Sequence, residues 1–192
     1  FGLWTVANGD ALPDGWVYRR GAIILWNEIY GWNGKPNEGL RKEASDVADM
    51  IRSKVGGRKL GYIAADPSMW KVDGGPSIAE TMLHRGVVLR KADNKRLVGY
   101  VQVRQRISGD EEGPMLYATK NCHDGFWRTM PDIVMDERHP EDVDTDNEDH
   151  AYDSVRYACM SRPWLSEVKK KDEARVKDWF VEKETEASWR TV

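Results

Sequence analysis

The apolar run at residues 22–30 (AIILWNEIY) constrains the fold most. Its β-branched and aromatic side chains favour an extended strand. A second strand-like segment, residues 3–6, precedes it, and two turn signals, residues 8–10 (NGD) and 13–15 (PDG), lie between them. The sequence therefore predicts an N-terminal antiparallel unit.

Strands and helices alternate after this unit. Residues 40–55 carry apolar side chains at helical spacing and end at Gly56 and Gly57, which favours a helix with a glycine stop. The other expected elements are strands at 60–65, 87–89 and 114–119 and helices at 77–85, 94–107, 122–130 and 147–160. This order predicts an α/β fold in which a parallel part follows the antiparallel one.

The length of 192 residues favours one substantial domain, and nine Trp, seven Tyr and three Phe supply material for its core. We assign this domain to residues 1–162 and a peripheral helix or tail to residues 163–192. The sequence begins at Phe1 inside a strand-like pattern and without Met. This start predicts that the first strand is truncated.

Charge and cysteine content bound the class of protein. A net charge of -3 argues against a protein that mainly coats nucleic acid, but it allows an enzyme with a local basic face. Cys122 and Cys159 form no CxxC pair, which favours reduced thiols in a cytosolic protein. No apolar run approaches the roughly 18 residues of a membrane helix, and no signal peptide is evident.

Asp66 is the first candidate for chemistry. It follows the apolar strand expected at residues 60–65 and precedes Pro67. Ligands of open α/β sheets bind at the carboxyl ends of the strands, so Asp66 is placed where a ligand would lie. The alternative is an Asp that opens a turn before Pro67.

An acidic run at residues 136–153 is the second candidate, with nine acids against only Arg138. Most charge runs are solvated loops. A calcium loop would use the alternating acids Asp142, Asp144 and Asp146, but Asn147 replaces the required Gly. Asp153 also stands where such loops carry Glu, so the calcium loop is disfavoured.

The acids near the helix expected at residues 147–160 fall into two groups, those that stabilise the start of the helix and those that do not. Thr145 and Glu148 match a capping box, and Asp149 would favour the positive end of the helix dipole, although it can also reach a metal. Asp153 lies beyond the first turn and has no such structural role. It is three residues from His150, so the two share one helix face and are the pair left for chemistry.

The third candidate is the basic segment at residues 84–107, which carries Asp93 as its one acid. Its seven cations are Arg85, Arg90, Lys91, Lys95, Arg96, Arg104 and Arg106. Either they contact phosphates or they form an ordinary exposed helix. No phosphate-binding glycine motif, no GxSxG and no zinc spacing of Cys and His is present.

Three segments together resemble the nuclease domain of the large terminase subunits of tailed bacteriophages. They are AADPSMW (64–70), KADNKRLVG (91–99) and EDHAYDSVRYA (148–158). The resemblance runs from Phe1 to about Arg162. It implies a ribonuclease H-like fold, an α/β mixed sheet flanked by helices, in which three acids hold two divalent ions.

The resemblance assigns roles to residues. Asp66 matches the second acid and Asp153 the third; His150 matches a His that accompanies the third acid in some members. The first acid would lie upstream of Phe1, so the metal site of this chain is incomplete as given. Catalytic roles thus fall to Asp66, Asp153 and His150, and metal binding to Asp66, Asp153 and Asp149.

The implied activity is a DNA endonuclease that cuts concatemeric viral DNA with two Mg²⁺ or Mn²⁺ ions. Duplex DNA would be positioned through its backbone by Lys91, Lys95, Arg96 and Arg104. The implied partners are the terminase ATPase domain of the same full-length chain, the portal and the small terminase subunit, in the cytoplasm of the bacterial host.

Two other functions fit the same residues. One is a recombination nuclease of the same fold, such as a Holliday-junction resolvase. The other is a catalytically incomplete module that docks on the packaging machine. Glu28, on the strand expected at residues 22–30, either lines the site or is an ordinary strand-end acid.

Overall fold

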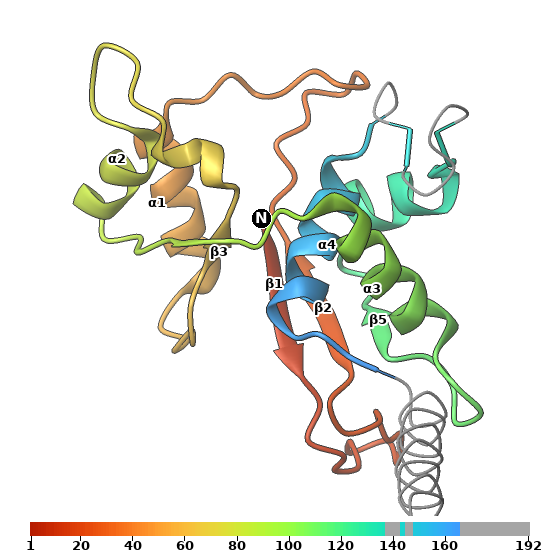
Figure 1. The fold of residues 1–192 in the computed structure, drawn as a ribbon. Helices are drawn as coiled ribbons and strands as arrows, with labels where there is room; N and C mark the ends of the chain where they lie inside the picture. The colour runs from red at the N-terminus through yellow and green to blue at the C-terminus, as the bar shows by residue number, and fades with distance from the viewer. Residues whose placement is uncertain (137–142, 145–147, 166–192) are drawn as a thin grey trace, which may run out of the picture.

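The structure is a computed structural model that describes residues 1–136, 143–144 and 148–165. Its elements form two groups on either side of the N-terminus (Figure 1). One group contains β1, β2, β5, α3 and α4, and the other contains β3, β4, α1 and α2. Most of the expected tail, residues 166–192, lies outside the described residues.

The first sheet has the order β1-β2-β5. β1 (Gly2–Val6) pairs antiparallel with β2 (Ile23–Glu28), and β2 pairs parallel with β5 (Leu116–Ala118). The predicted antiparallel unit is therefore confirmed. The first residues of β2 are buried because three consecutive aliphatic side chains, Ile23 to Leu25, pack into the core.

A second sheet pairs β3 (Ala64–Ala65) in parallel with β4 (Arg90–Lys91). The strand expected at residues 60–65 is thus reduced to two residues. The strand expected at residues 87–89 is instead observed at Arg90–Lys91. Val87 cannot join β4 because its N–H donates to the carbonyl of Met82 at the end of the preceding helix, at 2.9 Å. The parallel continuation is confirmed, but it is divided: β5 joins the first sheet, whereas β3 and β4 form a separate one.

The helices are α1 (Ala44–Val55), α2 (Ile78–His84), α3 (Arg96–Ser108) and α4 (His150–Ser161). Ser77 and Glu80 form a capping box that fixes the start of α2. α4 packs on β1 and β3, and α3 packs against α4. No helix in the described ranges is long and apolar enough to cross a membrane. The architecture is a mixed α/β fold.

Two apolar clusters stabilise the two groups. The first lies between the three-stranded sheet, α3 and α4, and it contains Tyr152, Val155 and Cys159 of α4. The second lies under α1 and α2 and is built around Ala48, Ile51, Met82 and Val87. Cys122 and Cys159 are free, fully buried thiols, which agrees with the predicted lack of a disulfide.

The helix expected at residues 122–130 is replaced by a single π-turn, His123–Trp127, and a 3-10 turn, Met130–Asp132. The carboxylate of Glu28 causes this change by accepting the N–H groups of Gly125 (2.7 Å) and Phe126 (3.2 Å). A side chain at Gly125 would collide with Glu28 and Tyr30, so the close approach requires glycine. Glu28 therefore acts as a strand-end acid that anchors the following turn.

Candidate functional site

Asp66 lies at the carboxyl end of β3, as predicted, and it also opens a turn. One carboxylate oxygen accepts the N–H of Ser68 at 2.7 Å, which caps the 3-10 helix Pro67–Trp70. The other oxygen accepts a hydrogen bond from the hydroxyl of Tyr157 on α4. The bonds from Ser68 and Tyr157 lower the pKa of Asp66, so its carboxylate is kept ionised.

Asp153 lies one turn before Tyr157 on α4. Its Oδ1 accepts two hydrogen bonds from Arg156, from Nε at 3.0 Å and from Nη2 at 2.9 Å. The guanidinium of Arg156 is buried and lies 4.5 Å from the centre of the Tyr157 ring. The expectation that Asp153 lacks a structural role is therefore wrong. We call Asp66, Asp153, Arg156 and Tyr157 the Asp66 junction.

Glycine on the neighbouring helix makes room for this junction. A Cβ at Gly99 of α3 would lie 2.5 Å from Cγ of Arg156 and 2.8 Å from its Cδ. Any side chain there would displace the arginine that holds Asp153. The close packing of α3 on α4 thus positions a candidate acid.

Asp149 and His150 lie at the start of α4. Burial raises the pKa of Asp149, and the negative charge of Asp153 raises it further. Arg96 approaches Asp149 to 3.9 Å, and His150 Nδ1 lies 3.7 Å from Asp149 Oδ1. The His150 side chain is 68% exposed, so its imidazole is accessible to solvent and to a ligand.

An apolar groove of about 570 Å³ runs beside these residues and is lined by residues of both β1 and β3. Within the described ranges, β1 pairs only with β2 and β3 only with β4, so each strand has one unpaired edge. His150, Asp153 and Tyr157 line this groove from α4. We call it the β1–β3 groove.

A second acidic site was missed by the sequence reasoning. Arg128 donates two hydrogen bonds to Glu148, at 2.8 and 2.6 Å, and lies 4.0 Å from the centre of the Trp32 ring. The Tyr30 hydroxyl donates to the same carboxylate at 2.7 Å. Arg128 lowers the pKa of Glu148, while burial and then Glu148 raise that of Tyr30. We call these four residues the Arg128 cluster.

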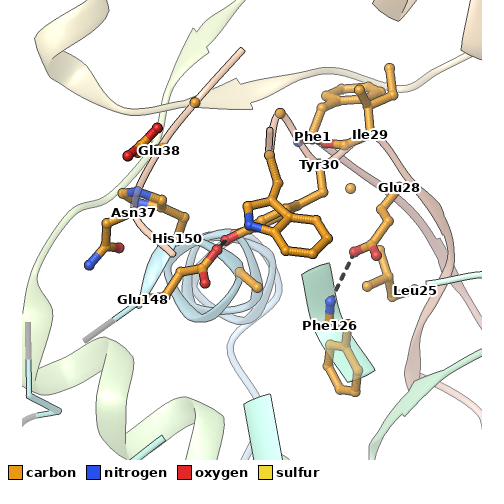
Figure 2. A pocket seen from close by; sticks show the side chains of 16 residues that line it. Phe1, Leu25, Glu28, Ile29, Tyr30, Asn37, Glu38, Phe126, Glu148 and His150 are labelled. Atoms are coloured by element: carbon orange, nitrogen blue, oxygen red, sulfur yellow. Dashed lines mark hydrogen bonds between the residues drawn. The ribbon is translucent and has the colours of Figure 1, made fainter. Parts of the chain in front are cut away.

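The Arg128 cluster borders a pocket of about 180 Å³, which Figure 2 shows from close by. Glu28, Tyr30, Glu148 and His150 line it from three different parts of the chain. The predicted capping role of Glu148 is not observed, because α4 begins after Asp149 without a side-chain cap. Its proposed partner, Thr145, lies outside the described residues.

The acidic run does not assemble a metal centre within the described part of the chain. No group of three His, Cys, Asp or Glu side chains placed to hold an ion is found there. Asp142 and Asp146 of the calcium-loop alternative lie outside the described residues. Asp144 belongs to a short antiparallel bridge region, where its N–H donates to Val134 at 3.0 Å.

The four predicted DNA-binding residues are spread along β4 and α3. Lys91 lies 5.6 Å from the centre of the Trp70 ring, and Lys95 is 3.7 Å from Asp93 at the start of α3. Arg104 is exposed, and it lies eight residues beyond Arg96, about 12 Å along the helix. Arg96 alone contacts the candidate acids, through Asp149.

Arg106, counted among the cations of this segment, is buried and unavailable to phosphates. It donates to the carbonyls of Met115 (3.1 Å), Gly21 (3.4 Å) and Arg162. Burial lowers its pKa. Its guanidinium instead joins three segments of the chain through these hydrogen bonds.

Arg156 had a signal that sequence reasoning could have used, since Asp153 and Arg156 are three residues apart on one helix. Arg128 had none, because its partner Glu148 lies 20 residues away across the acidic run. Comparisons of the chain with known protein families, with curated proteins and with solved structures find no match.

Proposed function

We propose that this chain is a metal-dependent DNA endonuclease domain of the ribonuclease H-like kind, from the terminase of a tailed bacteriophage. The observation that carries the proposal is the Asp66 junction. An acid at the end of one strand is joined through Tyr157 to the helix that presents a second acid, Asp153. Asp66 and the helix that carries Asp153 are distant in sequence, so their contact through Tyr157 is a property of the fold.

The carboxylates fit divalent metal ions in kind. Asp66 and Asp153 would be the main ligands and Asp149 an additional one, since hard ions such as Mg²⁺ and Mn²⁺ prefer oxygen donors. Burial and then the charge of Asp153 raise the pKa of Asp149, and a nearby cation would offset both effects. Two such ions, when bound, activate water for attack on a phosphodiester and offset charge on the leaving oxygen.

The side chains around the acids have separate tasks in this proposal. Tyr157 and Arg156 each hold one oxygen of a carboxylate, which fixes the orientation of Asp66 and of Asp153. His150 is accessible and close to Asp149, so its imidazole can transfer a proton to or from the reacting groups.

The β1–β3 groove gives a place for the third carboxylate. An extended segment lying in it would pair with both unpaired strand edges and bury apolar side chains against α4. In our proposal such a segment brings the third acid to the side of α4 that carries Asp153. Duplex DNA would then be held through its backbone by Lys91, Lys95, Arg96 and Arg104.

The test is plasmid nicking with Mn²⁺ or Mg²⁺ by a chain extended upstream of Phe1. We expect Asp66→Asn and Asp153→Asn to reduce nicking by more than the roughly 10–100-fold that losing an outer-shell partner causes. Asp73→Asn, an exposed loop acid outside the site, is the matched control. Equal nicking by all three variants and the unsubstituted chain would refute the assignment.

The same assay addresses the two other functions. A strong preference for four-way junctions over linear duplex would identify a junction resolvase instead. The docking module is favoured by one observation: Asp66 and Asp153 both have protein partners already. An extended chain that cuts no DNA under any metal, but binds a packaging protein such as the portal, would establish that function.

A further inference from the structure

Two stretches of the chain are basic and contain no acid. Residues 50–65 carry Arg52, Lys54, Arg58 and Lys59, and residues 81–92 carry Arg85, Arg90 and Lys91. The whole chain, in contrast, has 29 Lys and Arg against 32 Asp and Glu. The parallel pairing of β3 with β4 brings the two stretches together. Positive charge therefore gathers on one part of an acidic protein.

A groove of about 750 Å³ lies between these stretches, beside the C-terminal end of α1 and the segments that lead into β3 and β4. We call it the Arg58 groove. Its lining includes the acid Asp49, the cations Arg52, Arg58 and Arg90, and the side chains of Tyr62 and Val87. The groove precedes β3, whereas Asp66 follows it, so the two lie at opposite ends of the strand.

Some of the cations have structural roles. Arg52 and Arg85 both approach Asp49, at 3.7 and 3.8 Å, and Arg52 and Lys54 complement the dipole in the last turn of α1. Arg58 and Arg90 differ, because neither has a carboxylate partner within the described part of the chain. Their positive charge is therefore available to a ligand.

Three cations of these two basic stretches lie over aromatic rings. Arg58 lies 5.0 Å from the centre of the Trp26 ring, and Arg90 lies 4.8 Å from that of Tyr62. The third pair, Lys91 over Trp70 at 5.6 Å, is next to Asp66 in the fold. Tyr62 is four residues before Asp66, about 13 Å along an extended chain. The Arg90–Tyr62 and Lys91–Trp70 pairs thus form a track from the Arg58 groove toward Asp66.

We propose that the Arg58 groove binds a single-stranded segment of nucleic acid. Stacking on an aromatic ring holds a guanidinium flat and leaves its N–H edge free for a phosphate oxygen. Tyr62 is 37% exposed as a residue, which offers aromatic surface for an unpaired base. A folded duplex would present no such base, and an acidic peptide would not use the ring.

This site extends the proposed nuclease but does not depend on it, since binding is measured without catalysis. The probe is a fluorescent oligo-dT strand in EDTA at low salt, followed by anisotropy. We expect Arg58→Ala, Lys59→Ala and Arg90→Ala together to weaken binding about tenfold or more, and to reduce the slope of log K against log salt by about two.

The controls separate charge from stacking. Arg20→Ala, Lys35→Ala and Lys42→Ala remove the same three charges from exposed positions outside the groove and should leave the affinity unchanged within about twofold. Tyr62→Ala should cost about fivefold or more, whereas Tyr62→Phe keeps the ring and should bind normally. Unchanged urea midpoints show that each variant is folded.

Three outcomes would overturn the proposal. They are equal losses in the groove variant and the charge-matched control, normal binding by Tyr62→Ala, and tighter binding of duplex DNA or of a poly-Glu peptide than of oligo-dT. Loss of nicking in the Asp66→Asn chain with normal oligo-dT binding would leave the groove assignment intact. Failure of the nuclease and failure of the groove are thus distinguishable.

Discussion

The Arg128 cluster and the Asp66 junction hold similar charges in different ways. In the Arg128 cluster, both oxygens of Glu148 are bound by a bidentate arginine and one also accepts a tyrosine hydroxyl, so the carboxylate is satisfied by the protein. In the Asp66 junction, the hydrogen bonds from Arg156 use only one oxygen of Asp153. The ionised form of the neighbouring Asp149 is destabilised by burial and by the negative charge of Asp153.

This difference separates a structural site from a candidate chemical one. A fully paired carboxylate gains nothing from a cation, whereas a buried carboxylate near another negative charge does. Glu148 and Asp149 are consecutive residues, yet their pKa values are shifted in opposite directions. The start of α4 thus contains the boundary between the two environments.

The largest expected effect comes from breaking the Arg128 cluster. Arg128→Ala leaves Glu148, whose side chain is 11% exposed, without its cation. We expect a loss of about 3 kcal/mol in the free energy of unfolding, measured by urea denaturation, because an uncompensated buried charge is costly. Arg128→Lys should recover only part, since lysine lacks the bidentate geometry. An unchanged midpoint for Arg128→Ala would show that the cluster is not structural.

The next effect tests the packing beneath the Asp66 junction. Gly99→Ala places a methyl group 2.5 Å from Arg156, and we expect a destabilisation of about 1–3 kcal/mol because α3 and α4 must separate. Gly75→Ala is the matched control: it has nothing within 4 Å and no positive φ, so it should change stability by less than about 0.5 kcal/mol. Equal thermal midpoints for the two variants would contradict the close approach of the helices.

Glu148→Gln and Asp149→Asn should change stability in opposite directions at pH 7 in EDTA. The pKa of Glu148 is lower in the folded protein than in the unfolded one, so its ionised carboxylate stabilises the fold at pH values above the unfolded pKa. Glu148→Gln should therefore lower the free energy of unfolding by about 1–2 kcal/mol. The raised pKa of Asp149 destabilises the ionised folded state, so Asp149→Asn should be more stable than the unsubstituted protein by up to about 1 kcal/mol.

The pH dependence of stability tests both of these predictions. The gain of Asp149→Asn should disappear as pH falls from above the raised pKa of Asp149 to below its unfolded value of about 3.8. The loss of Glu148→Gln should begin to fade as pH falls below the unfolded value of about 4.5, and it should disappear below the lowered pKa of Glu148 in the folded protein. Urea midpoints between pH 7 and pH 3 measure both, and parallel curves for the two variants would contradict the comparison.

The smallest effect is expected at Tyr157. Tyr157→Phe removes the hydrogen bond to Asp66 and should cost about 0.5–1.5 kcal/mol. The ultraviolet titration of the tyrosines should lose a component near pH 12, because burial and then Asp66 raise the pKa of this phenol to about 12. Retention of that component in the variant would assign it to another tyrosine.

The sequence predicts elements well where local signals are strong. The aliphatic start of β2 and the helix expected at residues 77–85, observed as α2, both appear as expected. It fails where a distant group decides the backbone, as when Glu28 captures the N–H groups of Gly125 and Phe126 and forms a π-turn. β4 begins later in the sequence than expected for a related reason, because the N–H of Val87 donates a hydrogen bond to the carbonyl of Met82 in α2.

The candidate site shows the same division. Asp66 was placed at a strand end and His150 and Asp153 on one helix face by spacing alone, and both placements hold. The partners of these acids were not predicted, because the contact between Asp66 and Tyr157 spans 91 residues. The three-residue spacing of Asp153 and Arg156 would have predicted their contact on one helix face.

The two buried thiols make the protein convenient for labelling. Cys122 and Cys159 are fully covered, and burial raises the pKa of both, that of Cys159 to about 12. Neither should react with maleimide while the protein is folded, because the reactive thiolate is scarce and inaccessible. A single cysteine introduced on each side of the β1–β3 groove would then carry a dye without replacing the native thiols. Energy transfer between the two dyes would report directly whether a segment enters that groove.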